Sequence, residues 1–153
     1  MSGSLSDALV IFTLDEHHFA MCLGAVDRVV GAVEIAPLPD APAGVRGVIN
    51  VQGKILPVFD PRVRCGMPSR ELRISDQFII ARTRRREVAL VVDAVGGVVR
   101  RGEANVTPAA SILPNFSAVE GVMKLDGDLI LVHDIDRFLT MDEAERLQIA
   151  MEH

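Results

Sequence analysis

Residues 47–60 read GVINVQGKILPVFD, and residues 121–134 read GVMKLDGDLILVHD. The two stretches lie 74 residues apart and share their first glycine, seventh glycine and final aspartate, with apolar residues at matching places. Another pair of stretches, residues 19–30 and 88–99, repeats an apolar pattern at a spacing of 69 residues. Because apolar pattern and turn glycines repeat while polar residues do not, the sequence predicts two similar packing units with a surface between them.

The repeat divides the chain into half-units of roughly 8–66 and 76–139. We expect both in one domain, because a unit of about 70 residues is marginally stable alone. Residues 1–7 are mostly small and polar, and we expect a disordered tail. A terminal helix is expected over 140–151, since Thr140 and Glu143 have the spacing of a capping box. Its predicted docking face holds four apolar residues at helical spacing: Met141, Ala144, Leu147 and Met151.

Short apolar runs alternate with turn signals in both half-units, which indicates β-hairpins. The predicted hairpins join 8–14 to 19–23, 45–51 to 55–59, 77–82 to 87–92 and 119–125 to 129–133, with further strands near 29–35 and 95–100. Prolines in 36–44 predict an extended loop, and 104–116 is its counterpart. The fold class is therefore mainly β, with two barrel-like sheets of about five strands each and a short C-terminal helix.

Two local features carry more specific predictions. Asp60 and Asp134 occupy matching positions in the repeat, each before an expected helical turn, so we predict that both cap such turns. The paired glycines Gly96 and Gly97 predict a β-bulge or a close approach of another strand.

Composition excludes several classes of partner. The 153 residues carry a net charge of −5 and include no Trp or Tyr. An acidic chain gains nothing from counterion release on a phosphate backbone, and missing aromatic faces argue against stacking on sugars or bases. The one basic cluster, Arg82 with Arg84, Arg85 and Arg86, separates two apolar runs, so we interpret it as an exposed hairpin turn. We expect no nucleic-acid partner.

The compartment follows from cysteine usage and hydropathy. Cys22 and Cys65 form no Cys-x-x-Cys pair, so we expect buried thiols in a reducing compartment and no disulfide. The start lacks the basic region of a signal peptide. The longest apolar run, residues 19–26, is far short of the roughly 20 residues that a membrane-spanning helix needs. These features predict a soluble, cytoplasmic protein without direct membrane insertion.

No motif predicts catalysis. The four histidines have no partners at metal-ligand spacing, and no nucleophile elbow, phosphate loop or dinucleotide fingerprint is present. The most enzyme-like stretch is 133–136, where His133 and Asp136 would act as base and carboxylate. Phe59 replaces His133 in the other repeat, so a structural role is the simpler interpretation. We predict no catalytic residue, cofactor or metal, and an apolar surface for protein partners; an enzyme using His133 and Asp136 is the alternative.

The stretch 47–60 resembles the central motif of the CheW-like chemotaxis coupling proteins, G-V-x-N-L-R-G-x-I-x-P-x-x-D-L, and 121–136 is similar to that family's closing segment. The resemblance covers about 9–139. It implies two five-stranded SH3-like β-barrel subdomains related by internal duplication, and no catalysis. It also implies a scaffold or adaptor, peripheral in receptor arrays, that couples the cytoplasmic tip of methyl-accepting chemotaxis receptors to the regulatory domain of a CheA-type histidine kinase. A module of a chemosensory-like pathway that does not control motility is the alternative.

Two residues depart from the family pattern. The usual Arg of N-L-R-G is Gln52, and the Glu of the receptor-side V-x-E-I motif is Arg28. The resemblance places receptor binding on Val26, Arg28, Val29, Val51 and Gln52. Since both charges of the family's acid and base have changed, we predict that Arg28 and Gln52 are coupled and lie on one surface.

Overall fold

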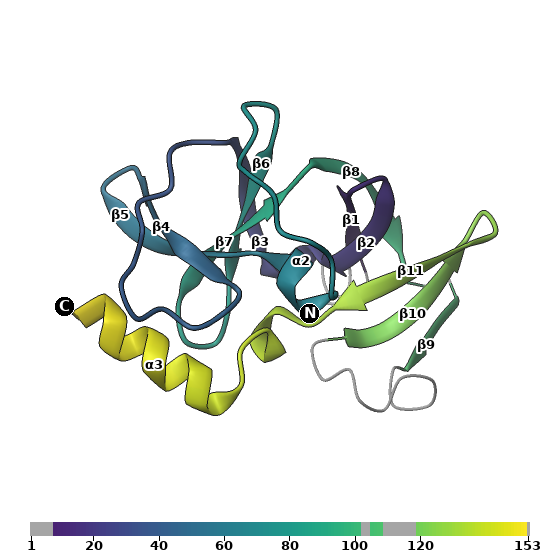
Figure 1. Cartoon of the computed structure of the whole chain (residues 1–153). Coiled ribbons are helices and arrows are strands. Elements are labelled where there is room, and N and C mark those ends of the chain that lie inside the picture. Colours follow the sequence, from purple (N-terminus) through teal and green to yellow (C-terminus); the bar gives the residue numbers. More distant parts are fainter. Residues whose placement is uncertain (1–7, 102–104, 109–118, 153) are drawn as a thin grey trace.

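The computed structural model describes residues 8–101, 105–108 and 119–152 (Figure 1). Its strands are β1 (Ala8–Leu14), β2 (His17–Cys22), β3 (Val26–Gly31), β4 (Val45–Val51), β5 (Lys54–Phe59), β6 (Gln77–Arg82), β7 (Glu87–Val92), β8 (Ala94–Arg100), β9 (Asn105–Pro108), β10 (Val119–Leu125) and β11 (Asp128–His133). Its helices are the short turns η1 (Leu23–Ala25), α2 (Pro61–Arg64) and η3 (Ile135–Arg137), and the C-terminal α3 (Met141–Glu152).

The strands form two sheets that lie side by side in Figure 1, with α3 running below one of them. The first sheet has the strand order β8-β1-β2-β11-β10-β9, and the second sheet has the order β3-β6-β7-β5-β4. The mainly β class and the division into two β subdomains are therefore confirmed. The first sheet has six strands where five were expected, because β9 lies in a segment predicted to be a loop.

The sheets do not follow the contiguous half-units 8–66 and 76–139. The first sheet combines the β1–β2 hairpin with β8, β10 and β11, whereas the second combines the β6–β7 hairpin with β3, β4 and β5. Each hairpin is joined to the other half-unit by a parallel pair, β2 with β11 and β7 with β5. The half-units have thus exchanged their first hairpins. An apolar pattern specifies which face of a strand is buried. Equivalent strands of the two copies carry the same pattern, so the pattern does not specify which copy a hairpin pairs with.

The central strands are buried on both faces, because alternate residues along each strand belong to different hydrophobic cores. On β7, Val88, Leu90 and Val92 point into a core shared by the two sheets, while Ala89 and Val91 point into the second sheet's own core. Strand β1 divides in the same way between the shared core and the core of the first sheet. Side chains of successive strand residues point to opposite faces, so these hairpins hold the two sheets together as one body.

The repeat extends to irregularities of the backbone. The β4–β5 register shifts between Val45 and Gly47, and the β10–β11 register shifts between Val119 and Gly121, at matching positions. In β4 the shift accompanies a second contact, because Val48 pairs with Ala36 of the proline-rich segment. The β1–β8 register also shifts next to the paired glycines of β8, as predicted.

Gly47 is required by this second contact. A Cβ atom on Gly47 would lie 2.2 Å from the backbone oxygen of Ala36, and its φ is +148°. The two backbone hydrogen bonds between Ala36 and Val48 measure 2.8 and 2.9 Å. They bring the segment after β3 against β4, so the opposite edges of the second sheet are drawn toward each other.

Most element boundaries agree with the sequence predictions. Asp60 and Asp134 cap their turns, accepting hydrogen bonds of 3.0 Å from the backbone N–H groups of Arg62 and Asp136. The capping box of α3 is also present. Its predicted docking face is partly wrong, because Met141 is 75% exposed while Ala150 is buried beside Leu147. The expected tail over 1–7 lies outside the described residues.

The two thiols are free and half-buried in the structure. No helix within the described residues combines the length and the hydropathy that crossing a bilayer requires.

Candidate functional site

The edge strand β3 and the β4–β5 turn meet at one end of the second sheet. Strand β3 alternates between half-buried and exposed residues, as an edge strand does when one face packs on the core. The turn places Gln52 and Gly53 at φ angles of +51° and +87°, typical of a two-residue hairpin turn. The Asn50 side chain accepts a 2.9 Å hydrogen bond from the Gly53 N–H and stabilises the turn.

Arg28 and Gln52 are joined at this point. The Arg28 Nη1 donates a 3.0 Å hydrogen bond to Gln52 Oε1 across 24 residues of sequence. The prediction that the two residues share one surface is confirmed. Arg28 also lies 3.9 Å from the carboxylate of its neighbour Asp27, and its side chain is 39% exposed. Part of the Arg28 side chain is therefore accessible to a partner.

Below this pair lies a hollow of about 250 Å³ with charged walls. Its lining includes Lys54 and Glu87, which form a 3.0 Å ion pair across the sheet. The hydrogen bond from Lys54 lowers the pKa of the Glu87 carboxyl, so this acid stays charged at neutral pH. The hollow is thus bordered by fixed charges of both signs.

The structure separates the valines proposed for receptor binding. Val29 is 37% exposed on β3, so its side chain is available to a partner. Val26 is half-buried against the shared core. Val51 is only 9% exposed and belongs to the core of the second sheet. Of the three, Val29 offers the most accessible side chain, whereas Val51, next to the turn, packs in the core.

The enzyme-like residues do not come together. The His133 ring lies in the core, with its centroid 5.4 Å from the Phe19 ring and 5.9 Å from the Phe12 ring. Burial lowers its pKa to about 4, so it is neutral at pH 7. Asp136 is exposed and accepts a 2.7 Å hydrogen bond from the Arg84 backbone. The arrangement gives no base–carboxylate pair from these two residues, and this alternative is set aside.

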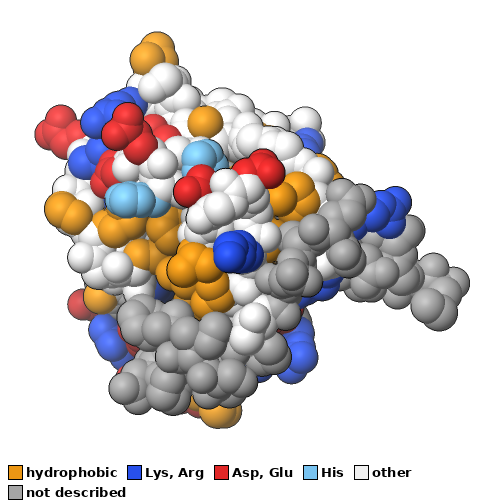
Figure 2. All heavy atoms as spheres, turned by 90° about the vertical axis from the view of Figure 1, so that its right-hand side faces the viewer, with side chains coloured by type: hydrophobic (Ala, Val, Ile, Leu, Met, Phe, Trp, Pro, Cys, Tyr) orange, Lys and Arg blue, Asp and Glu red, His pale blue; other side chains and the backbone are white. Residues whose placement is uncertain are grey.

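His133 borders a second hollow, of about 290 Å³, between β2, β11 and the segment after α2. Figure 2 shows hydrophobic side chains gathered next to histidines on this face. The hollow is lined by apolar Phe19, Met67 and Leu131 together with Cys65, whose sulfur lies 3.7 Å from His133 Nε2. Burial raises the pKa of the Cys65 thiol to about 11, so it is an unreactive thiol at neutral pH.

Sequence reasoning missed a cluster of charges at the junction of the sheets. Arg62, only 1% exposed, contacts Asp93 and lies 3.1 Å from Asp15. Arg70 bridges Asp93 and Asp76, the latter at 2.7 Å. Burial opposes ionisation of Asp93, but hydrogen bonds from Arg62 and its neighbours hold its pKa below the ordinary value. The five residues come from four separate segments, so no local motif indicated them.

Comparison with known proteins identifies the family of the chain. The family model for the CheW-like domain matches residues 8–143. The chain is 32% identical over 139 residues to the chemotaxis protein CheW of Rhizobium meliloti, with 90% of each chain covered. It is 33% identical over 142 residues to the chemotaxis protein CheW of Thermotoga maritima, covering 89% of this chain and 93% of that protein.

A solved structure extends the similarity to the fold. The scaffolding protein TtCheW from Thermoanaerobacter tengcongensis superposes with a TM-score of 0.78 at 27% identity, covering 90% of this chain and 95% of that one. The chain belongs to the CheW-like domain family.

Proposed function

We propose that this protein is a non-catalytic adaptor that couples a methyl-accepting chemotaxis receptor to the regulatory domain of a CheA-type histidine kinase. Family membership and the fold shared with a scaffolding protein support this function. An adaptor of this kind works in the cytoplasm, at the periphery of receptor arrays.

The observation that carries the proposal is the Arg28–Gln52 pair, whose Arg28 lies on the same edge strand as exposed Val29. This pair stands where the family motif has an acid and a base, and a hydrogen bond joins the two altered residues. We propose that Arg28, Val29 and Gln52 contact the receptor, while Val26 and Val51 hold β3 and the turn against the cores. Successive side chains of a strand point to opposite faces, so a receptor that fits this edge contacts both faces of β3. It offers an apolar side chain to Val29 and an acceptor to Arg28.

The proposal is tested by reconstituting the cognate receptor and kinase with and without this protein. We expect complex formation and a change in kinase activity only when the protein is present. If both are the same without it, the adaptor function is wrong.

The receptor surface has a matched internal control. Val29 of β3 and Val98 of β8 are equivalent in the repeat, both lie on edge strands, and Val98 is 56% exposed. Val29→Asp should weaken receptor binding at least about tenfold, since burying an apolar side chain contributes about 1.5–3 kcal/mol. Val98→Asp should leave binding unchanged. Both variants should keep the melting temperature. Equal losses of binding in the two variants would show that the receptor does not bind specifically at β3.

A further inference from the structure

The arginine turn between β6 and β7 forms one wall of a hollow of about 320 Å³ against η3 and α3. Three hydrogen bonds hold the turn in place. The Arg84 backbone N–H donates to Asp136 at 2.7 Å, and the Arg86 guanidinium donates to Gln148 and Met151 of α3. The hollow is therefore built by three elements that are fixed to one another.

Its lining combines an apolar floor with a cationic rim. The floor includes Phe59, Ile135 and Leu147, and Met141 stands 75% exposed at its edge. The lining contains four arginines and two aspartates, a local charge of +2 in a chain of net charge −5. Within the described part of the chain, the Arg85 guanidinium has no hydrogen-bond acceptor or carboxylate in contact. The rim thus carries a positive charge that is not neutralised.

The internal repeat allows the contact between the arginine turn and η3 to be compared with the equivalent contact in the other copy. Asp15 and Arg84 are equivalent at the spacing of 69, and Arg62 and Asp136 are equivalent at the spacing of 74. Both pairs are in contact, Arg62 with Asp15 at 3.1 Å and Arg84 with Asp136 at 3.8 Å. The same contact between a hairpin turn and a helical turn thus occurs twice, with the charges reversed.

In the first copy, carboxylates of the chain itself surround the arginines. Arg62 and Arg70 share Asp15, Asp76 and Asp93, three acids for two bases. In the second copy the lining offers two aspartates to four arginines. The charged cluster with excess acid is filled by the protein's own segments, whereas the equivalent cluster with excess base borders an open hollow.

We propose that this hollow binds an acidic segment of a partner protein, whose carboxylates meet Arg84 and Arg85 and whose apolar side chains cover Met141 and the floor. Charge complementarity favours this occupant, and the apolar floor requires more than a free anion. The inference does not depend on the receptor surface, which lies on β3 and the β4–β5 turn.

The test uses the full chain and three synthetic peptides of about 12 residues, which reach roughly 40 Å when extended. One alternates Glu with Leu, the second replaces Glu by Lys, and the third replaces Leu by Ser. Binding is measured by fluorescence anisotropy and mapped by amide chemical-shift changes. We expect the Glu–Leu peptide alone to bind with substantial affinity, with shifts confined to the arginine turn, η3 and the first turns of α3.

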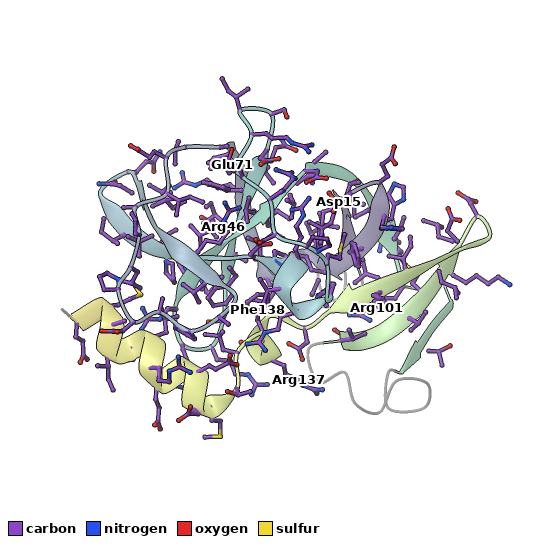
Figure 3. The ribbon with its side chains drawn as sticks, viewed as in Figure 1. Asp15, Arg46, Glu71, Arg101, Arg137 and Phe138 are labelled. Atoms are coloured by element: carbon purple, nitrogen blue, oxygen red, sulfur yellow. The ribbon has the colours of Figure 1, made fainter. Side chains whose placement is uncertain are left out.

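Two variants with a matched control complete the test. Arg85→Glu should weaken binding about tenfold, more than the usual effect of one exposed pair because the charge is reversed. Met141→Ser should weaken it about threefold through lost apolar contact. Arg73→Glu makes the same charge change in the exposed loop beside Glu71, which Figure 3 places at the far side from Arg137, and should have no effect.

Several results would overturn the proposal. These are no binding of the Glu–Leu peptide, shifts that map elsewhere, or equal losses in Arg85→Glu and Arg73→Glu. Undiminished binding of the Glu–Ser peptide would show a simple anion site. Stronger binding to vesicles of anionic lipid than to the peptide would show a membrane-facing surface instead.

Discussion

The matching hairpins of the two repeat copies share features of their backbone and differ in the charges around them. Hairpins β4–β5 and β10–β11 have the same register shift, the same turn glycine and the same capping aspartate. Yet Arg62 after the first hairpin is buried among carboxylates, while Asp136 after the second is exposed beside arginines. What recurs in both copies serves the fold. What occurs in only one copy marks where that copy has acquired its own role.

The largest expected effect comes from Gly47→Ala, which tests a backbone contact that only the first copy is shown to make. The added Cβ would lie 2.2 Å from the Ala36 oxygen, so we expect a loss of at least about 3 kcal/mol in unfolding free energy. Gly127→Ala, in the turn of the second copy, meets open space at a φ of +86° and should cost about 1–2 kcal/mol. Chemical denaturation measures both. Equal losses would show that the contact with Ala36 contributes nothing.

The next largest difference between the two copies is expected when the arginine of each ion pair, Arg62 or Arg84, is replaced by Met. Arg62→Met leaves Asp15 and Asp93 with Arg70 as their remaining base, and we expect a loss of about 3 kcal/mol, as for other buried pairs. Arg84→Met removes a side chain that is 90% exposed and should change stability by less than about 1 kcal/mol. The same denaturation measurement applies. A small effect of Arg62→Met would mean that water replaces its contacts.

Acid should destabilise the second copy through His133. Its pKa is about 4 in the folded state and about 6.5 when unfolded, so the unfolded chain binds the proton first. The stability that neutral His133 provides is complete above pH 6.5 and is lost as the pH falls toward 4. We expect a loss of about 2 kcal/mol between pH 7 and pH 5.

His133→Phe copies the first repeat, where Phe59 occupies this position, and should remove that loss. Unfolding free energies at pH 7, 6 and 5 test the expectation. An unchanged pH dependence in His133→Phe would assign the effect to other groups. The acids with lowered pKa values titrate below this interval.

The smallest expected effect concerns the Arg28–Gln52 pair, which the second copy lacks, having Gly97 and Asp126 at the equivalent positions. Gln52→Arg places a second cation against Arg28 and should weaken receptor binding. Gln52→Arg with Arg28→Glu should recover part of it, with a coupling of about 0.5–1 kcal/mol. Asp126→Arg serves as the control and should leave receptor binding unchanged. A coupling of zero in the double-mutant cycle would contradict a joint role.

The sequence by itself determined the elements and their repetition. The strand runs, the turn at Asp126-Gly127, the caps Asp60 and Asp134 and the capping box of α3 all depend on residues close together in the chain. Their geometry is local, so a local pattern is enough to predict it. The Arg28–Gln52 contact was also predictable, because two motif positions changed their charge together.

Only the tertiary structure decided which strands share a sheet. The two copies bury equivalent apolar faces, so pairing β1–β2 with β11 instead of β5 cannot be inferred from the pattern. The same exchange brings Asp15 to Arg62 and Arg84 to Asp136, and it leaves one of these positions filled and the other open. Burial of Val51 and of His133 follows from this packing too, since a residue next to a turn is buried or exposed according to what packs over it.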